Sequence, residues 1–576
     1  MSIHWPIIRR LALSPKRVVM VDDRRSYTAI EVLVGAMHIA GAISAKCKTP
    51  TVGLLIPTSG AFPMAALAGW MLGKTVVPIN YLLKPEEMNY IVRDCGCDTV
   101  ITAQAMVEFL GAGLEECLYG KVEVGSGNGE VGTKTHGQDA HATEMKNLVK
   151  LEDISFKGMP EFHWPKIVGD DALGVLLYTS GTSGKPKGVM LSHGNITANI
   201  RQIQEWVHFV PGKDIMFGVL PQFHTFGLTV LSLLPLTCGI KVVYTARFVP
   251  GRIIKLIREH RPTAFVAIPS MFNALLHAKD ASKEDFASLR FVVSGGEPLP
   301  QVVFDTFREK FGVTIAEGYG LTETSPVTNW CRPEEWKRGT VGKPLPRVEQ
   351  RIVAIEGVGQ GDKVTRGQGD KGISHPVPLS PCPLVSAWSE VPNGQEGEIR
   401  IKGPNVMQGY FHLPEETATA FDENGYFRTG DIGRFDADGL LYITGRLKEM
   451  LIIGGENVFP REIEEVLNAH PSVKDSGVVG KKDPMRGEVP VAFVEMKDAL
   501  STGGGTGSSS ASGVGTASND NGKMPFDEKA LIQWCRTKLA GYKVPDEIRV
   551  LDALPRNPTG KVVRRELKKM VEGSAT

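Results

Sequence analysis

Between residues 170 and 345 the sequence alternates short apolar runs with segments of helical periodicity. Four isoleucine and valine residues recur at helical spacing within 196–207 and predict one buried helix face. The run 263–268 predicts a buried strand, and Pro269 stands where the next helix should begin. Residues 291–293 predict another buried strand. Buried strands that alternate with helices predict an α/β protein, whose β-sheets are covered by helices.

The chain of 576 residues is too long for one ordinary core, so we expect at least two domains. A turn-rich β segment at 436–443 is followed by a new alternating pattern, in which Pro460 opens an amphipathic helix. This change predicts a large N-terminal domain at 1–445 and a small, mobile α/β domain at 446–576. Stretches rich in glycine and polar residues predict surface insertions, the last of them flexible, at 125–143, 357–383 and 501–522.

The bulk composition excludes several classes of protein. A formal net charge of +1 gives no reason to expect a nucleic-acid partner. Eight scattered cysteines, with Cys95 and Cys97 as the single close pair, indicate buried thiols in a reducing compartment rather than a zinc site. The N-terminus lacks the pattern of a signal peptide. The most apolar stretch, 61–79, is interrupted by Pro63 and Lys74, so it predicts a buried helix and strand rather than a membrane span.

The segment Tyr178–Gly188, with the sequence YTSGTSGKPKG, follows a predicted buried strand at 173–178. Its glycines allow a tight turn with inward N–H groups, and its hydroxyls and two lysines suit a polyphosphate. Aligned on Gly184 and Lys185, it lacks the first glycine and the final Ser or Thr of a Walker A loop. We therefore interpret it as a phosphate-binding loop of another kind.

Several further blocks follow in a fixed order: SGGEP at 294–298, EGYGLTET at 317–324, YFRTGD at 426–431, GRLKE at 445–449 and PTGK at 558–561. Together with the phosphate loop they resemble the adenylate-forming superfamily, which includes acyl- and aryl-CoA ligases, firefly luciferase and the adenylation domains of peptide synthetases. The resemblance covers nearly the whole chain outside the three insertions. It implies an enzyme that activates a carboxylic acid with ATP and Mg²⁺ as an acyl-adenylate, and then transfers the acyl group to a thiol.

By this resemblance, the β- and γ-phosphates are held by Thr179, Ser180, Gly181, Thr182, Ser183, Gly184 and Lys187. Thr322 contacts the α-phosphate, and Glu323 binds magnesium with help from Thr179. The adenine lies between Tyr319, flanked by Gly318 and Gly320, and the segment of Gly295, Gly296 and Glu297. Asp431 accepts hydrogen bonds from the ribose hydroxyls, and Arg446 also reaches the nucleotide. Taken singly, Glu323 also suits a capped helix start, Tyr319 a core position and Asp431 a turn.

The resemblance gives two lysines separate tasks. Lys561 bridges the carboxylate and the α-phosphate during adenylation, although its basic surroundings also suit a solvated helix. Lys448 matches the pivot about which the C-terminal domain turns after adenylation, although taken alone it also suits an exposed loop. Gly454 and Gly455 then lie close to the pantetheine arm of coenzyme A.

The segment Pro221–Gly227 matches the substrate-side block of the superfamily. No acidic residue occurs from Pro221 through Gly239, which argues against an amino-acid substrate and for an uncharged acyl chain. His224 either contacts the carboxylate or packs among aromatic rings. The block looks closest to fatty acyl-CoA ligases and acyl-carrier-protein synthetases, so we expect a medium- or long-chain fatty acid.

Coenzyme A is the expected acyl acceptor, with acyl carrier protein as the alternative. An alternative outside the enzymes is a module that binds an acyl-adenylate without turnover. The presence of every expected nucleotide residue argues against this alternative: Thr322, Glu323, Asp431, Arg446 and Lys561. We expect a cytoplasmic protein without a transmembrane segment. Peripheral contact with a membrane stays open.

Overall fold

A computed structural model describes residues 2–111, 113–114, 118, 146–179, 185–355, 390–454, 456–497, 526–556 and 560–573. The predicted insertions at 125–143, 357–383 and 501–522 lie outside these residues, as do Ser180–Gly184 of the phosphate loop, Gly455 and residues 557–559.

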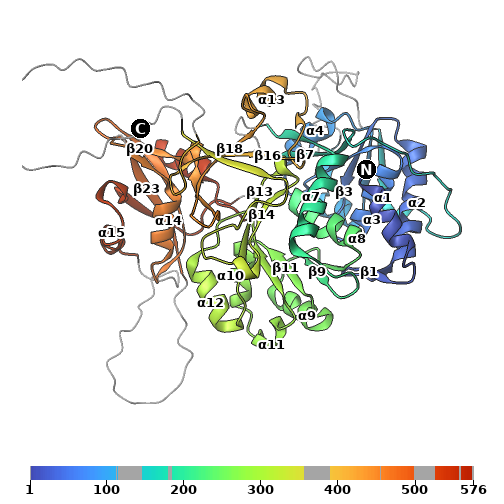
Figure 1. Ribbon diagram of the computed structural model, residues 1–576, viewed down its shortest axis with the longest axis horizontal. Helices are drawn as coiled ribbons and strands as arrows, with labels where there is room; N and C mark the ends of the chain where they lie inside the picture. Colours follow the sequence, from blue (N-terminus) through green and yellow to red (C-terminus); the bar gives the residue numbers. More distant parts are fainter. Residues whose placement is uncertain are drawn as a thin grey trace, which may run out of the picture.

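A seven-stranded sheet occupies one end of the molecule (Figure 1). Its order is β17-β8-β7-β4-β3-β5-β6; neighbours from β7 to β6 run parallel, and β8 and β17 are added antiparallel. Its strands are β3 (Thr51–Leu55), β4 (Thr75–Pro78), β5 (Thr99–Thr102), β6 (Asn147–Lys150), β7 (Leu173–Thr179), β8 (Lys187–Ser192) and β17 (Gly409–Tyr410).

An eight-stranded sheet lies beside it, in the order β14-β13-β12-β11-β9-β10-β1-β2. The neighbours from β13 to β1 are parallel, and the two edge strands are antiparallel. Its strands are β1 (Val18–Val21), β2 (Ser26–Thr28), β9 (Ile215–Gly218), β10 (Lys241–Tyr244), β11 (Ala264–Ala267), β12 (Phe291–Ser294), β13 (Ala316–Gly320) and β14 (Val327–Trp330).

Helices cover both large sheets, and α7 (His193–Val207) contacts strands of each. The other helices of this region are α1 (His4–Ala12), α2 (Ala29–Lys46), α3 (Ala61–Met71), α4 (Pro85–Asp94), α5 (Gln104–Leu110), α8 (Leu234–Cys238), α9 (Pro250–His260), α10 (Pro269–Leu276), α11 (Lys283–Phe286) and α12 (Gln301–Phe311). Short 3-10 turns are η1 (Leu151–Asp153), η3 (Thr322–Thr324) and η4 (Pro333–Glu335), and η2 (Phe226–Leu233) is a π-helix. The predicted α/β architecture is confirmed.

Local sequence patterns explain several of these elements. The apolar face predicted within 196–207 is the buried side of α7, and Ser192 caps that helix by accepting a hydrogen bond from the N–H of Asn195. The stretch 61–79 forms α3 and β4, as predicted, and nearly every residue of α3 is buried. Pro269 opens α10, directly after β11.

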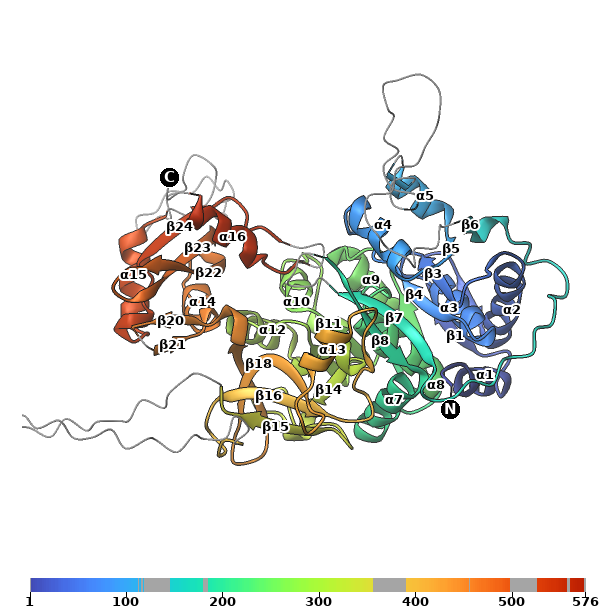
Figure 2. The same ribbon diagram turned by 90° about the horizontal axis from the view of Figure 1, so that it is seen from above.

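Two smaller sheets complete the chain (Figure 2). The third has the order β15-β16-β18-β19, and the fourth has the order β21-β20-β23-β22 with β24 on β23. Their strands are β15 (Glu349–Val353), β16 (Gly397–Lys402), β18 (Phe427–Phe435), β19 (Leu441–Arg446), β20 (Leu451–Ile453), β21 (Glu456–Val458), β22 (Val473–Asp483), β23 (Gly487–Met496) and β24 (Glu547–Leu551). The accompanying helices and turns are α13 (Pro414–Ala420), η5 (Leu447–Glu449), α14 (Pro460–Asn468), α15 (Glu528–Arg536), η6 (Gly541–Lys543) and α16 (Arg564–Glu572).

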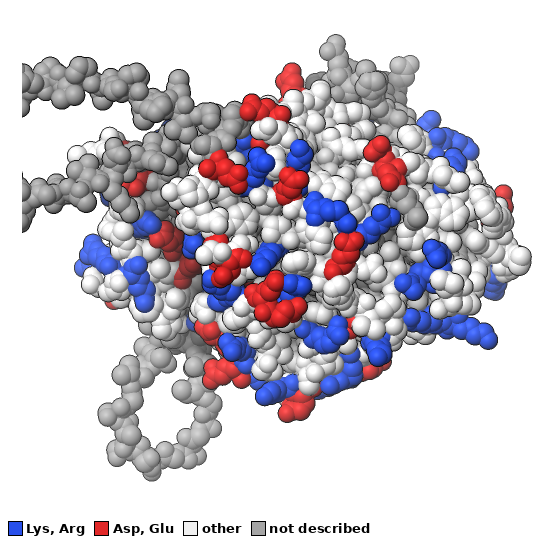
Figure 3. Space-filling model, in the orientation of Figure 1, with Lys and Arg blue, Asp and Glu red and all other residues white. Residues whose placement is uncertain are grey.

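One helix among the described residues, α2, has the length and apolarity of a membrane span. It lies against α1 and α3, and its buried residues include Val32, Ala36 and Ile39. This is the position of a core helix. On the face shown in Figure 3, basic and acidic side chains are interspersed rather than gathered into a field of one sign.

Candidate active site

The phosphate loop predicted from the sequence is carried by the antiparallel hairpin of β7 and β8. Thr179 pairs with Lys187 across this hairpin, directly before and after the loop. The Lys187 ammonium lies 5.4 Å from the centre of the Tyr410 ring. Residues 180–184 lie outside the described residues. The hairpin therefore fixes the two ends of the loop, Thr179 and Lys187, beside Tyr410.

Tyr410 joins this hairpin to the predicted magnesium ligand. It belongs to β17, which pairs with β8, and its hydroxyl donates a hydrogen bond of 3.0 Å to Oε1 of Glu323. The N–H of Met407 also donates to the carbonyl of Glu323 at 2.8 Å. Burial raises the pKa of the Glu323 carboxyl, and the hydrogen bond from Tyr410 offsets part of that rise. Sequence reasoning did not identify Tyr410.

Glu323 and Thr322 lie in η3, in the turn between β13 and the edge strand β14 of the eight-stranded sheet. The turn needs glycine at position 320, because a Cβ there would stand 2.1 Å from the carbonyl oxygen of Pro326. Ser325, at the end of the turn, has a left-handed backbone conformation with φ of 70°. The local sequence thus folds the chain back sharply and places Glu323 against Tyr410.

A second cluster gathers three residues predicted to hold the nucleoside. The Tyr319 hydroxyl donates to Oδ2 of Asp431 at 2.7 Å, and Nε of Arg446 lies 2.8 Å from Oδ1. Asp431 and Arg446 are also register partners in β18 and β19. Burial and the charge of Asp431 raise the pKa of Tyr319, while the charge of Asp431 raises that of Arg446. Each carboxylate oxygen of Asp431 therefore has one protein partner and keeps acceptor capacity for a further donor.

The segment Gly295–Glu297 follows β12 directly. A Cβ at Gly295 would stand 2.9 Å from the ring of Phe226, and Gly296 has φ of 82°, so both positions favour glycine. Burial raises the pKa of Glu297, and the charge of Lys561 lowers it. Glu297 therefore lies within electrostatic reach of the predicted catalytic lysine.

Lys561 comes from the C-terminal part of the chain and faces the large sheets. A Cβ at its neighbour Gly560 would lie 3.7 Å from Oγ of Ser270 in α10. Burial and the charge of Arg446 lower the pKa of the Lys561 ammonium, and Glu297 and Glu449 raise it. Lys561 therefore lies within electrostatic reach of Arg446 and Glu297, two other residues predicted to face the nucleotide.

The predicted pivot, Lys448, lies in η5 and is exposed. It is two residues beyond Arg446, and partial burial followed by the charge of Arg446 lowers its pKa. Gly454 has φ of 61°, and its N–H donates to the carbonyl of Arg486 within the fourth sheet. A Cβ at Gly454 would meet no atom of the described residues within 4 Å. The described contacts of Gly454 therefore lie in the fourth sheet rather than with the nucleotide residues.

Two ring contacts connect His224 to Tyr81, which lines a large apolar cavity; His224 itself is not among the lining residues. Its ring lies 4.7 Å from that of Phe223, which in turn lies 4.8 Å from that of Tyr81. Among the described residues, His224 Nε2 is buried without a hydrogen-bond partner. Burial lowers the pKa of His224 to about 4, so the imidazole is neutral at pH 7.

The cavity next to Tyr81 has a volume of about 880 Å³. It lies at the carboxyl ends of strands from both large sheets, where ligands bind in open α/β sheets. Much of its wall is apolar and includes Ile39, Ile56, Met64, Leu151, Val219, Pro221, Phe248 and Met271. Met271 follows Ser270, so the cavity reaches the surroundings of Lys561. Its size falls within the usual range for small-molecule sites.

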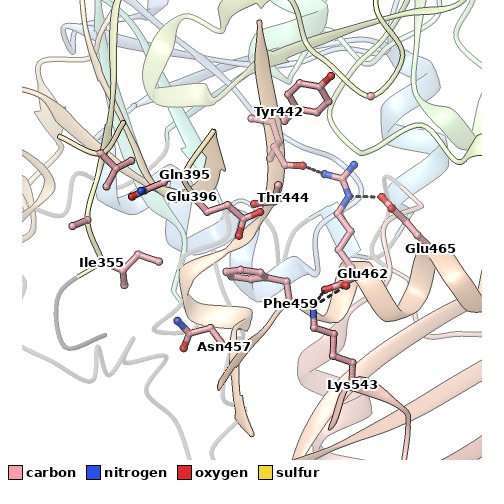
Figure 4. A pocket seen from close by; sticks show the side chains of 15 residues that line it. Ile355, Gln395, Glu396, Tyr442, Thr444, Asn457, Phe459, Glu462, Glu465 and Lys543 are labelled. Atoms are coloured by element: carbon pink, nitrogen blue, oxygen red, sulfur yellow. Dashed lines mark hydrogen bonds and ion pairs between the residues drawn. The ribbon is translucent and has the colours of Figure 1, made fainter. Parts of the chain in front are cut away.

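A second cavity, of about 540 Å³, lies between the third sheet and the C-terminal part of the chain (Figure 4). Across it, the Arg461 guanidinium donates to the carbonyl of Ile443 and pairs with Glu465 at 2.9 Å. Lys543 pairs with Glu462 at 2.7 Å. The contact of Arg461 with Ile443 therefore joins a residue that follows Lys448 in the sequence to one that precedes it.

The residues present fit a magnesium ion that is held mainly by phosphate. Magnesium in nucleotide sites is usually bound by one or two carboxylates together with substrate phosphates. Glu323 offers one carboxylate, and Thr179, which carries a hydroxyl, pairs across the hairpin with Lys187, whose ammonium lies over the Tyr410 ring that contacts Glu323. No cluster of three or more His, Cys, Asp or Glu side chains suited to a metal occurs in the described part of the chain.

Comparisons with known proteins match both parts of the chain. The model of the AMP-binding enzyme family matches residues 8–372, and that of the AMP-binding enzyme C-terminal domain matches residues 462–561. A long-chain-fatty-acid–CoA ligase of Escherichia coli O6:H1 (strain CFT073) is 30% identical over 551 residues, which cover 91% of this chain and 86% of that protein. The 4-coumarate–CoA ligase 5 of Oryza sativa subsp. japonica is 29% identical over 581 residues, which cover 99% and 94%.

Solved structures agree with these matches. ATP-bound MatB from Rhodopseudomonas palustris superposes with a TM-score of 0.78 at 26% identity, over all of both chains. The o-succinylbenzoate CoA synthetase of Bacillus subtilis in complex with ATP and magnesium gives a TM-score of 0.74 at 26% identity, over 98% of this chain and 99% of the other. Because the first family match alone spans more than half of the sequence, the chain belongs to the AMP-binding enzymes, within the adenylate-forming superfamily of acid–CoA ligases.

Proposed function

We propose that this enzyme is a fatty acid–CoA ligase, which converts a medium- or long-chain fatty acid first to acyl-AMP and then to acyl-CoA. The observation that carries the proposal is the apolar cavity of about 880 Å³ that Tyr81 and Met271 line. A fatty acyl chain needs a long apolar site, with its carboxylate at the reacting end. The absence of acidic residues from Pro221 through Gly239 agrees with an uncharged chain.

In this proposal, the acyl chain fills the cavity with its carboxylate next to Met271, at the end that reaches the surroundings of Lys561. The charged residues of the cavity wall, such as Arg24, Arg25 and Glu152, are among its more exposed positions. The lining therefore suits a tail that is apolar throughout and a head group at the opposite end.

Adenylation then joins two anions. A carboxylate oxygen attacks the α-phosphorus of ATP, the bond to the β-phosphate oxygen breaks, and pyrophosphate leaves. We assign Lys561 to the carboxylate and α-phosphate, Thr322 to the α-phosphate, and Thr179, residues 180–184 and Lys187 to the β- and γ-phosphates. The nucleoside belongs to Tyr319, Asp431, Arg446 and the Gly295–Glu297 segment. Magnesium, held by Glu323 and Thr179, supplies charge neutralisation for the triphosphate.

Thioester formation needs a different arrangement of the C-terminal part. The thiolate sulfur of coenzyme A attacks the acyl carbon, the bond from that carbon to the phosphate oxygen breaks, and AMP leaves. We assign Lys448 as the pivot of the rotation and Gly454 with Gly455 to the passage of the pantetheine arm. The contact between Arg461 and Ile443 spans the pivot, so a rotation there has to break it.

A panel of carboxylic acids tests the proposal, with ATP-dependent pyrophosphate release measured with and without coenzyme A and acyl carrier protein. Long-chain acids should give the highest kcat/KM, and coenzyme A should be the thiol that becomes acylated.

Ala105, in the cavity wall, provides a paired test. Ala105→Phe should reduce turnover of long-chain acids and spare short ones, whereas Ala105→Ser should spare both. Preference for an aromatic acid, or equal effects of both variants on all chain lengths, would contradict the assignment.

The described cysteines are buried and free, as is usual for proteins of a reducing compartment, so we assign this reaction to the cytoplasm.

A further inference from the structure

The segment between η1 and β7 holds a row of large apolar side chains in solvent. We call residues 155–168 the apolar strap; in Figure 2 the teal segment after β6 passes outside α2 and returns toward α1. The exposed fractions are 96% for Met159, 85% for Ile167, 70% for Trp164, 62% for Phe162 and 46% for Phe156. Single exposed apolar residues are common on protein surfaces, but a contiguous group of this size marks an interaction site.

The backbone of the strap is fixed to the body of the protein. The N–H of Lys166 donates to the carbonyl of Met71 at 2.8 Å, and the carbonyl of Lys166 lies 3.0 Å from Nε2 of His4. Pro165 is buried and His163 is half-buried, whereas the neighbouring Phe162 and Trp164 are exposed. The fold thus turns alternate residues inward and holds the aromatic rings outward.

The strap continues the mouth of the large cavity. Ile154 and Phe156, at the start of this segment, line that cavity. Two other cavity residues, Ile30 and Phe109, are also large, apolar and half exposed. An apolar surface therefore extends from the cavity mouth along the strap toward Trp164.

We propose that the apolar strap docks on the surface of a lipid bilayer. Tryptophan and phenylalanine are side chains that settle at the boundary between head groups and acyl chains. Continuity with the cavity favours lipid over a protein partner, because a bilayer also dissolves the long apolar substrates that the cavity suits. This consequence for turnover rests on the proposed function, whereas docking itself does not.

The charges near the strap make the docking apolar rather than electrostatic. Lys157 and Lys166 are the lysines of the strap, and Glu161 is its one carboxylate. Beside the strap, Glu152 and Asp153 pair with Arg24 and Lys150 at 3.9 and 3.8 Å, and Asp170 and Asp171 follow it. Because these charges nearly balance, anionic lipid should not strengthen binding, and added salt should not abolish it.

Sedimentation of the full chain with phosphatidylcholine vesicles tests the docking. The triple variant Phe162→Ser/Trp164→Ser/Ile167→Ser should lose at least about tenfold in vesicle affinity, because three apolar side chains leave the interface. Met485 is 94% exposed in the turn between β22 and β23, so Met485→Ser is the matched control and should bind as the parent does. Vesicles that contain phosphatidylserine should bind the parent chain no more tightly than phosphatidylcholine vesicles do.

Activity on a water-soluble short-chain acid shows whether the triple variant remains folded, and it should be unchanged. Equal sedimentation of parent and triple variant would overturn the proposal, as would tighter, salt-sensitive binding to the anionic vesicles. A parent that is dimeric by light scattering and becomes monomeric in the triple variant, with no difference on vesicles, would assign the strap to self-association instead. If no fatty acid is turned over while vesicle binding follows the expected pattern, the proposed substrate fails and the docking stands.

Discussion

Tyr410→Phe removes a single hydroxyl from the candidate active site. That hydroxyl donates to Glu323 at 3.0 Å, and Glu323 is the one carboxylate that we assign to magnesium. Hydrogen bonds to charged groups contribute roughly 1.5–3 kcal/mol, and water can replace part of this bond. We therefore take the lower end, which corresponds to about a tenfold loss, since 1.4 kcal/mol is a factor of ten.

The loss of activity in Tyr410→Phe should appear in the pH profile and in the magnesium dependence of adenylation. Tyr410 lowers the pKa of Glu323, which burial has raised, so removing the hydroxyl raises that pKa further. Magnesium needs the ionised carboxylate, so the acidic limb of the adenylation profile should move to higher pH. The half-saturating magnesium concentration should also rise about tenfold, whereas the KM for the fatty acid should stay the same.

ATP–pyrophosphate exchange measured against magnesium concentration and pH is the assay. Tyr426 makes a comparable hydrogen bond to Glu349, at 2.7 Å in the third sheet, so Tyr426→Phe is the matched control. The control should leave the magnesium dependence unchanged. If Tyr410→Phe shows the same magnesium half-saturation and the same acidic limb as the parent, Tyr410 does not position the metal ligand.

Four further outcomes are expected. Lys561→Ala should reduce adenylate formation by at least about a hundredfold while thioester formation from supplied acyl-AMP stays nearly intact; equal loss of both would refute its role. Lys448→Pro should block thioester formation and spare pyrophosphate exchange, and normal turnover would remove Lys448 as the pivot. Arg461→Ala removes the hydrogen bond to the Ile443 carbonyl, so single-turnover adenylation should slow several-fold relative to thioester formation. An unchanged ratio of the two rates would show that this contact does not stabilise the adenylation arrangement. Burial lowers the pKa values of His4 and His193 to about 4, so below pH 6.5 the unfolded chain binds more protons than the folded one. The melting temperature should therefore fall from pH 6.5 toward pH 4, and it should fall less in His193→Asn. A melting temperature that does not change over this pH range would contradict the reasoning.

The sequence predicted the elements better than the contacts between them. Helical spacing within 196–207 and Pro269 were sufficient to place α7 and α10, because these signals are local. Tyr410 was missed because it stands 87 residues from Glu323 and meets it only through the pairing of β17 with β8. The adjacent Gly409 is held close to Thr417, where a Cβ would collide, but this close approach is visible only in the fold and not in the sequence.

The cavity could not be predicted from the sequence either. Its wall combines residues from α2, α3, α5 and the ends of strands in two sheets, and no local pattern relates them. Asp431 and Arg446 were each predicted to face the nucleotide, but their pairing with each other depends on the register of β18 and β19. No sequence pattern singled out the apolar strap, because the exposure of a side chain is a property of the fold rather than of residue type.

In the proposed function, the position of Lys448 would let one site serve two reactions. Arg446 belongs to β19 and is held by Asp431, so a rotation at Lys448 would leave both of these residues in place. Beyond the proposed pivot, Arg564 pairs with Glu449 at 2.9 Å and with Glu464 at 2.6 Å, and Lys561 lies three residues before Arg564. These ion pairs would make η5, α14 and α16 move together. The same motion would therefore withdraw Lys561 from the α-phosphate, while Asp431 and Arg446, only two residues before the pivot, would keep their contacts with the nucleotide.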